Sequence, residues 1–439
     1  MNRISEIELL LPAGDFQKMK YAYAYGADAT YLGIPRFSLR ARENGFKENT
    51  VVSAIHYAHE LGKKVYLTAN IIPHNHKVQP FLHYVDRLLA EIQPDAWIMS
   101  DPGIIAAMKE KHPEQNIHLS VQANCTNYAA ARFWQSMGID RIILSRELSL
   151  KEIGQIRAAC PDLELEAFVH GSICIAYSGR CLISNYMSGR DPNQGTCSHS
   201  CRWVYKVYAK NPEETPVADN DYTPLSGDYY LEESKRPGEF IPIDEDENGT
   251  YFMNARDLCA IEYLSDLQAA GVNSFKVEGR NKSVYYTVII ARAYRWAMND
   301  LYRGNPFNAD HLAEARSTAN RGFIPGFLLG NPGAVAQKYD SDRPEKATHR
   351  FAGIVHTYDE KLKRIKVEPR NPIRVGMTLE LITPDQTSIF PVTELYNNDM
   401  EAIEIIHGGL HYCWIPCQQD PGPMALLRES VVSPVGSEL

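Results

Sequence analysis

The chain has 439 residues, with 45 Lys and Arg against 54 Asp and Glu, a net charge of −9, 44% hydrophobic residues and 23% charged residues. This balance is that of a folded protein and excludes a mainly disordered chain, a collagen or a low-complexity scaffold. No apolar run reaches the roughly 20 residues that a membrane-spanning helix needs, and residues 1–12 lack the regions of a signal peptide. We therefore expect a cytoplasmic protein of two or three domains, with reduced thiols and no membrane partner.

From residue 6 to about residue 300, short runs rich in β-branched residues alternate with helical patterns. The eight strand-like runs are Glu6 to Pro12, Ala29 to Gly33, Lys64 to Asn70, Ala96 to Ser100, Ile117 to Gln122, Arg141 to Ser145, Leu163 to Val169 and Ser274 to Val277. Eight βα units predict an α/β fold, a (β/α)8 TIM-like barrel over residues 1–325. The alternative, a doubly wound open sheet, lacks its Gly-x-Gly-x-x-Gly fingerprint after the first run, where Pro12 to Asp15 stand.

Polar residues follow nearly every strand-like run. The carboxyl ends of barrel strands form the active face, so these residues are the candidates for a ligand site, although each alone could serve only a turn or a surface ion pair. We expect catalytic roles for Arg146, Glu147, His170, Glu278 and Arg280. We expect substrate-binding roles for Arg40, Arg42, Asn70, Gln122 and Asn124.

About a hundred residues separate the seventh and eighth runs, far more than an ordinary βα loop. Within this insertion (171–250), Gly171 to Lys210 carries five basic residues against Asp191, interleaved with aromatic residues. Cations hold phosphates and flat rings stack on bases, so this segment suits RNA, although a solvated surface explains the pattern as well. Its candidate binding residues are Arg180, Arg190, Arg202 and Trp203. Asn211 to Thr250 carries twelve acidic residues and is expected to be a mobile surface insertion.

Four of the nine cysteines fall in the basic segment, with the spacing C-x6-C-x15-C-x3-C. They are Cys174, Cys181, Cys197 and Cys201. Four thiolates can bind zinc or an iron–sulfur cluster, and the wide first interval favours the cluster; four unrelated buried thiols are the alternative. Among the other cysteines, Cys413 and Cys417 are a weak ligand pair, and Cys259 is a reserve ligand.

Beyond the barrel, residues 326–350 have the loose composition of a linker. From Phe351 the pattern changes to apolar and polar alternation, without helical runs between. The five strand-like runs are Gly353 to His356, Leu362 to Val367, Met377 to Leu381, Ser388 to Val392 and Glu401 to Ile406. They predict a small antiparallel β-barrel domain over residues 351–439.

The sequence resembles the U32 family of collagenase-like peptidases over most of its length. The matching motifs are Leu10 to Gly14, Tyr23 to Asp28, Asn70 to His74, Asp101 to Gly103, Ser120 to Asn124, Ser145 to Ser149, Glu166 to Cys174, Gly179 to Ser184, Arg190 to Cys197 and Lys276 to Arg280. The peptidase name of this family is not tied to settled catalytic residues.

Within the family, the sequence is most similar to a tRNA-hydroxylating branch. This resemblance implies oxygen-independent, prephenate-dependent C5-hydroxylation of the wobble uridine in the anticodon loop of tRNA. It also implies an iron–sulfur cluster, of the 4Fe–4S type, on Cys174, Cys181, Cys197 and Cys201. Cys259 lies outside the shared pattern.

Three hypotheses follow. In the first, a tRNA hydroxylase, the planar forks of Arg40, Arg42, Arg146 and Arg280 clamp a dicarboxylate such as prephenate. In the second, a cysteine peptidase, Cys174 or Cys181 is the nucleophile and His170 or His199 the base, which excludes a cluster on the same thiol. The third is a cluster-bearing RNA-binding module without catalysis.

Overall fold

The computed structural model describes residues 7–39, 45–174, 176–202, 208–210, 222–224, 229–232, 240–246, 249–251, 255–336, 347–409 and 411–431. Within them, eight parallel strands close into a barrel, because β14 pairs with both β1 and β7. The barrel strands are β1 (Glu8–Ala13), β2 (Ala29–Gly33), β3 (Lys64–Ala69), β4 (Ala96–Met99), β5 (Ile117–Leu119), β6 (Arg141–Ile143), β7 (Glu164–Ser172) and β14 (Ser274–Val277). The predicted (β/α)8 barrel is therefore confirmed.

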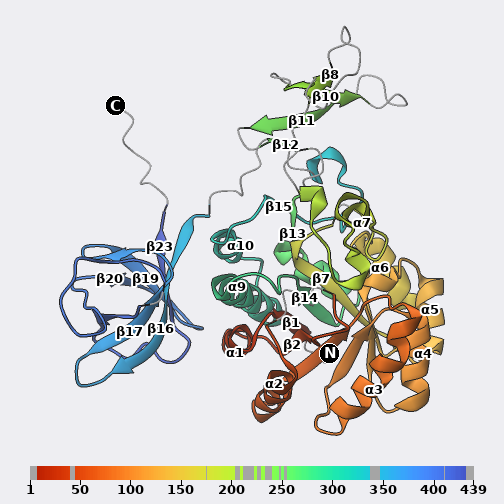
Figure 1. Ribbon diagram of the computed structural model, residues 1–439, viewed down its shortest axis with the longest axis horizontal. Coiled ribbons are helices and arrows are strands. Elements are labelled where there is room, and N and C mark those ends of the chain that lie inside the picture. The colour runs from red at the N-terminus through yellow and green to blue at the C-terminus, as the bar shows by residue number, and fades with distance from the viewer. Residues whose placement is uncertain are drawn as a thin grey trace.

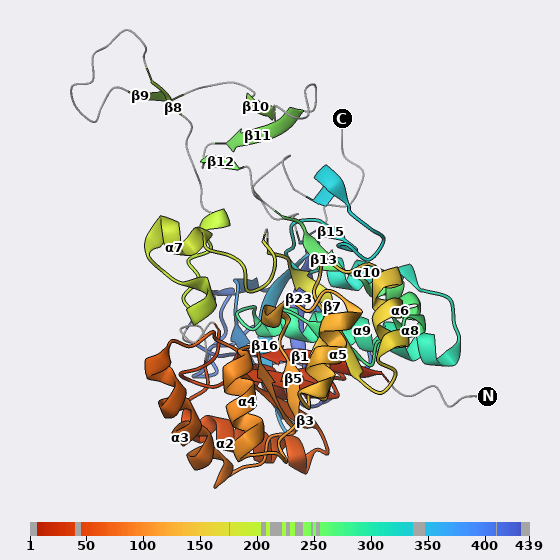
Figure 2. The same ribbon diagram turned by 90° about the vertical axis from the view of Figure 1, so that its right-hand side faces the viewer.

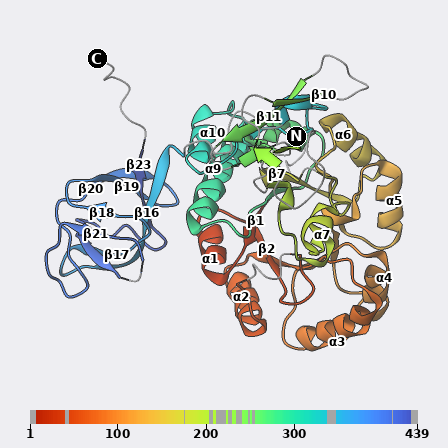
Figure 3. The same cartoon turned by 45° about the horizontal axis from the view of Figure 1, so that its top comes forward.

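Helices surround the barrel, as Figure 3 shows in a view toward its opening. They are α1 (Phe16–Ala24), α2 (Glu48–Glu60), α3 (Val78–Leu89), α4 (Pro102–Lys111), α5 (Tyr128–Ser136), α6 (Leu150–Ala159), α8 (Leu264–Ala269) and α9 (Val284–Arg303). Several start at a side-chain cap on the last residue of the preceding loop: Asp15, Asp101 and Asn127 each accept a backbone N–H two or three residues into the helix. These caps fix the loops that connect the strand ends to the helices.

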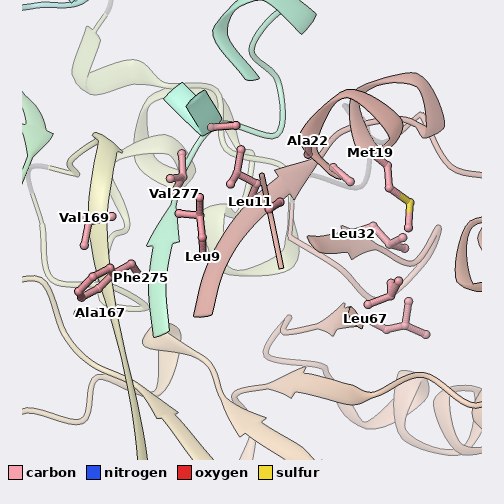
Figure 4. Close-up of a cluster of buried hydrophobic side chains, with 14 of the residues drawn as sticks. Leu9, Leu11, Met19, Ala22, Leu32, Leu67, Ala167, Val169, Phe275 and Val277 are labelled. Atoms are coloured by element: carbon pink, nitrogen blue, oxygen red, sulfur yellow. The ribbon is translucent and has the colours of Figure 1, made fainter. Parts of the chain in front are cut away.

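Alternation along each strand separates two cores. Leu9, Leu11, Val169, Phe275 and Val277 face outward and pack between the strands and the helices, as the close-up in Figure 4 shows. The inward side chains form a smaller apolar layer inside the barrel: Leu10, Ala29, Tyr31, Tyr66, Ala96, Ile98, Val121, Ile143, Phe168 and Leu258. Charged and polar residues occupy the barrel interior on either side of this layer.

The insertion leaves the barrel after β7. It contains α7 (Ile183–Ser188) and the short strands β8 (Tyr208–Lys210), β9 (Tyr222–Pro224), β10 (Tyr229–Glu232), β11 (Phe240–Asp246) and β12 (Gly249–Tyr251). Figures 1 and 2 show β8 to β12 standing away from the barrel. The chain returns through β13 (Asp257–Cys259), which pairs antiparallel with the extended end of β7 and carries β15 (Phe323–Ile324) on its other edge. Parts of the predicted acidic insertion, and Trp203, lie outside the described residues.

The C-terminal strands are β16 (His349–Asp359), β17 (Arg364–Pro369), β18 (Ile373–Arg374), β19 (Thr378–Ile382), β20 (Thr387–Pro391), β21 (Ile405–Ile406), β22 (Cys413–Pro416) and β23 (Leu426–Ser430). Six of them form one antiparallel sheet in the order β20-β19-β23-β16-β17-β22, and β18 pairs with β21. The predicted small antiparallel domain is confirmed; its sheet forms a half-barrel around its own apolar core. Within the predicted linker, residues 337–346 lie outside the described part of the chain.

The half-barrel packs on the helix layer beside α1, α9 and α10 (Ala309–Arg316), as Figure 1 shows. The Tyr25 hydroxyl donates to the carbonyls of Ile382 and Met424, at 3.1 and 3.0 Å. Arg428 of β23 forms a 3.1 Å ion pair with Glu314 of α10. No helix in the described residues is both long and apolar enough to span a bilayer.

Candidate functional site

A cavity of about 100 Å³ lies inside the barrel at the carboxyl ends of its strands. We call it the mouth cavity. Five of the predicted strand-end residues line it: Asn70, Gln122, Arg146, Glu278 and Arg280. They follow four different strands, β3, β5, β6 and β14, so the convergence results from closure of the barrel rather than from proximity in the sequence.

Arg280 is held in place by neutral acceptors from the β2 and β3 ends. One of its terminal nitrogens donates to Ser38 Oγ at 3.0 Å and Thr68 Oγ1 at 3.1 Å, and the other donates to the carbonyl of Leu39 at 2.6 Å. The backbone after β1 passes so close that a Cβ on Gly14 would lie 1.9 Å from the carbonyl oxygen of Arg280. This position therefore requires glycine, and the planar fork of Arg280 is positioned before any ligand arrives.

Arg146 lies on another side of the same cavity. Its guanidinium carbon is 4.0 Å from the centre of the Phe168 ring, and one terminal nitrogen donates to the carbonyl of Ser172 at 2.9 Å. The Nε atom is buried without a hydrogen-bond partner among the described residues. Glu278 accepts a hydrogen bond from the Tyr31 hydroxyl at 3.1 Å.

Sequence reasoning missed Lys276, which lies on the floor of the mouth cavity. Its side chain is 3% exposed, and its ammonium donates to Glu166 at 2.7 Å. Burial lowers the pKa of this lysine, while Glu166 opposes the shift. A lysine inside the apolar run Ser274 to Val277 was the available signal, since strand alternation turns it into the barrel.

Three predicted strand-end residues do not reach the mouth cavity. Asn124 has a left-handed backbone (φ 54°), and its amide donates to Ser145 Oγ at 3.0 Å, so it shapes the turn after β5. One carboxylate oxygen of Glu147 is buried without a partner among the described residues. His170 packs outside the barrel, against Tyr294 and Phe323.

The position of His170 follows from a β-bulge. Lys276 of β14 pairs with Phe168, but the next residue, Val277, pairs with His170, so β7 carries one extra residue here. Because Val277 faces outward, His170 faces outward as well. Burial lowers the pKa of His170 to about 3, so the ring is neutral in the folded protein at ordinary pH.

All four predicted cysteines line a second cavity of about 320 Å³, which we call the thiol cavity. Cys174 and Cys197 are exposed, whereas Cys181 and Cys201 are partly buried. The backbone N–H of His199 donates to the sulfur of Cys197 at 3.4 Å. Arg190 and His199 also line this cavity, whereas Arg180 is exposed outside its lining.

The four thiols are a donor set that could hold an iron–sulfur cluster, because such clusters are bound by cysteine thiolates. In a cluster each thiolate binds a different iron atom, so the four sulfurs stand further apart around a larger group. A cavity bordered by four thiols, with an amide already donating to one sulfur, matches that requirement.

The segment that carries the four cysteines, from Cys174 to Cys201, is called the cysteine segment. Close contacts fix it to the barrel. The N–H of Ile72, in the β3–α3 connection, donates to the carbonyl of Asn193 at 3.1 Å, and Lys77 donates to Gln194 at 2.7 Å. Gly179 has φ +75°, and a Cβ there would lie 2.2 Å from the carbonyl oxygen of Gln122. Gly179 therefore permits the close approach of the segment to the end of β5.

The two cavities share part of their lining. Leu39, Gln122, Cys174, Ser178 and Glu278 border both. Figure 3 shows α7, within the cysteine segment, over the opening of the barrel, and Figure 2 places it on the same side as β13. Together they form a composite site in which a thiol, Cys174, borders a cavity lined by cations.

The cysteine segment exposes aromatic and basic side chains. Tyr177 and Tyr186 are 54% and 83% exposed, and Arg180 and Arg190 of the same segment are exposed as well. Exposed rings and guanidinium groups are suited to stacking on unpaired bases. Arg202 ends a 3-10 turn, and its side chain, like Arg40, Arg42 and Trp203, lies outside the described residues.

The five other cysteines are buried: Cys125, Cys160, Cys259, Cys413 and Cys417. Burial raises the pKa of Cys259 to about 11 and that of Cys413 to about 12. Cys259 lies 3.8 Å from the Tyr294 hydroxyl and does not line the thiol cavity. These thiols act as small apolar side chains.

A (β/α)8 barrel, a thiol-lined cavity over its mouth and a β half-barrel together define a class of barrel protein in which cysteines border a cavity at the carboxyl ends of the strands. A sequence model of "Peptidase family U32" matches residues 14–338, and one of "Peptidase family U32 C-terminal domain" matches residues 347–428. The chain belongs to peptidase family U32.

Several curated relatives are similar to this chain in sequence. The chain is 43% identical to "tRNA hydroxylation protein P" of Escherichia coli, over 94% of each chain. It is 40% identical to the protein of the same name in Haemophilus influenzae, over 97% of this chain and 96% of the relative. It is 30% identical to the Escherichia coli "23S rRNA 5-hydroxycytidine C2501 synthase", over 77% of this chain and 47% of that relative.

Proposed function

We propose that this protein hydroxylates tRNA, at C5 of the wobble uridine, without molecular oxygen and with prephenate as co-substrate. The observation that carries the proposal is the composite site, where four thiols and a cationic barrel pocket share a wall. Two relatives at 43% and 40% identity are named for tRNA hydroxylation, and a more distant relative is named for 5-hydroxycytidine in rRNA. All three names describe modification of RNA, and two of them specify tRNA.

Cys174, Cys181, Cys197 and Cys201 are the residues that would hold an iron–sulfur cluster of the 4Fe–4S type. When bound, such a cluster supplies one-electron redox chemistry beside the substrate. Hydroxylation at C5 is a two-electron oxidation of the base, so it needs an electron acceptor and an oxygen donor in addition to the side chains of this site. Cys174 borders the mouth cavity and is the thiol nearest to the co-substrate in this arrangement.

The other side chains bind and orient. Arg146 and Arg280 offer guanidinium groups to the carboxylates of prephenate. Glu278 borders both cavities and is the carboxylate that accepts the proton displaced from C5. Tyr177 and Tyr186, with Arg180 and Arg190, hold the anticodon loop by stacking and phosphate contacts.

The test is expression in a bacterial host that lacks its own tRNA hydroxylation proteins, followed by mass spectrometry of the tRNA nucleosides. We expect the wild-type chain to restore 5-hydroxyuridine-derived nucleosides and Cys197→Ala to abolish them. Cys417→Ala is the matched control, because Cys417 follows Cys413 at the same x3 spacing but is buried in the half-barrel. Wild-type protein that leaves the tRNA of this host unmodified would refute the proposal.

One observation favours a cysteine peptidase as the competing function: His199 lines the same cavity as the four thiols. His170, the other predicted base, lies outside that lining. Anaerobic purification separates the two functions. Brown protein with matched iron and sulfide, both lost in Cys174→Ala, supports the cluster, whereas colourless, iron-free protein with a reactive thiol supports the peptidase.

A further inference from the structure

The mouth cavity has a cationic side and an apolar side. Its described lining contains three cations, Arg146, Lys276 and Arg280, and one carboxylate, Glu278. The apolar part of the lining is made by Ile98, Val121, Ile143 and Phe168. Such a pocket selects a small dianion that also carries a hydrocarbon ring, because the charges need cations and the ring needs apolar surface.

Two aromatic rings gather the three cations. The ammonium of Lys276 lies 4.2 Å from the centre of the Tyr31 ring, and Arg280 lies 5.9 Å from the same ring. Lys276 also lies 5.6 Å from the centre of the Phe168 ring, on which Arg146 stacks at 4.0 Å. Lys276 therefore shares one ring with each arginine and occupies the innermost position of the set.

The ammonium of Lys276 has more donors than its hydrogen bond to Glu166 uses, so it is able to bind a ligand. Of its three N–H groups, one donates to Glu166, at 2.7 Å, within the described residues. Glu166 is fully buried and is also bound by Arg141 at 3.2 Å, so its charge does not depend on Lys276 alone. The Lys276 side chain also borders the mouth cavity, so a ligand there can reach its ammonium.

We infer that Lys276 is the innermost substrate-binding residue of the mouth cavity and holds one carboxylate of a small, ring-bearing dianion, while Arg146 and Arg280 hold the second. The inference rests on the proposed function only for the choice of prephenate as that dianion. Glu166 fixes the ammonium in place, and Tyr31 and Phe168 shield it from water.

The experiment measures prephenate binding to the purified full-length protein by isothermal titration calorimetry, with no RNA present. Lys276→Met alone leaves one oxygen of Glu166 buried without its partner and risks misfolding. The informative pair is therefore Glu166→Gln, which keeps the ammonium, and Lys276→Met/Glu166→Gln, which replaces the ion pair by a neutral pair. We expect the double variant to bind prephenate at least about tenfold more weakly than Glu166→Gln, the loss expected for one charge-assisted hydrogen bond.

The matched control is Lys64→Met, which removes a lysine from the opposite end of the barrel, where Lys64 lies 3.8 Å from Glu8. We expect it to bind prephenate as the wild type does. The inference is overturned if the double variant binds within about threefold of Glu166→Gln, if Lys64→Met weakens binding equally, or if the wild type shows no saturable binding.

The outcome is separable from that of the proposed function. If the wild-type chain binds prephenate through Lys276 but leaves tRNA unmodified, the proposed function fails and the inference stands. If tRNA is hydroxylated while the double variant keeps its affinity, the inference alone fails.

Discussion

The barrel interior carries charged side chains at both ends, but the two ends use them differently. At the strand starts, Arg141 binds Glu8 at 2.5 Å and Glu166 at 3.2 Å, and Glu8 also accepts hydrogen bonds from Tyr66 and Ser274. At the strand ends, cations outnumber carboxylates in the described lining of the mouth cavity. Ion pairs fill the first end, whereas at the second end three cations and one carboxylate line a cavity within the described residues.

The comparison shows that residue type alone does not tell whether a charged side chain stabilises the fold or binds a ligand. Its burial and its ion-pair partners do. Burying an ion is costly unless its partner is buried with it, so a saturated network contributes to a unique fold. Hydroxyl and carbonyl acceptors, such as those that Arg280 contacts at the strand ends, orient a cation without neutralising it. Lys276 joins the two ends, because it pairs with Glu166 and borders the mouth cavity.

The largest expected effect is the loss of stability when Arg141, at the strand starts, is replaced. Arg141→Met should lower the free energy of unfolding by about 3–5 kcal/mol, since it leaves two buried carboxylates short of a cation. Urea unfolding followed by circular dichroism measures this. Arg87→Met, which removes an exposed ion pair with Glu48, is the control and should cost less than about 1 kcal/mol. Equal losses in the two variants would contradict a special role for the buried network.

Substitution of a cation at the mouth cavity should reduce tRNA hydroxylation rather than the stability of the fold. Arg146→Gln should leave the free energy of unfolding within about 1 kcal/mol, because the side chain is only partly buried. It should raise the KM for prephenate in tRNA hydroxylation about tenfold to a hundredfold, the loss of one charge-assisted hydrogen bond. Steady-state assays measure this KM. Iron content and tRNA affinity, measured on the same samples, serve as controls. An unchanged KM would mean that Arg146 does not bind prephenate.

Low pH should destabilise the folded protein because of the buried ring of His170. Burial lowers the pKa of His170 to about 3, so below about pH 6.5 the unfolded chain takes up a proton that the folded protein does not. Stability therefore falls as the pH falls, by about 2 kcal/mol at pH 5 from this group. His170→Phe keeps a ring among Tyr294 and Phe323 and should reduce the loss between pH 7 and pH 5 by that amount. The same acid sensitivity in both proteins would reject this assignment.

The sequence predicted the barrel because each strand is a contiguous run whose pattern is local. For the same reason, it placed Asn70, Gln122, Arg146, Glu278 and Arg280 at strand ends, which barrel closure then brings together. The four cysteines were found by spacing alone, and the structure groups them around one cavity.

What the sequence did not reveal depends on non-local pairing. His170 was expected at the mouth, but the bulge that turns it outward exists only in the register between β7 and β14. Lys276 lies within a strand rather than after it, and its value as a binding group depends on Tyr31, Phe168 and Glu166 from other strands. Asn124 has a left-handed backbone, and its side chain bonds to Ser145 after β6, a contact that only the fold brings about.

The smallest expected effect separates pairing from burial at the strand starts. Lys64 lies 3.8 Å from Glu8, but its side chain is 59% exposed, so water already solvates its charge. Lys64→Met should therefore change the free energy of unfolding by less than about 1 kcal/mol, and the change should shrink further at high salt. Urea unfolding in low and high salt measures both. A loss approaching that of Arg141→Met would mean that proximity to Glu8, rather than burial, governs the network, and the contrast between the two barrel ends would then need another cause.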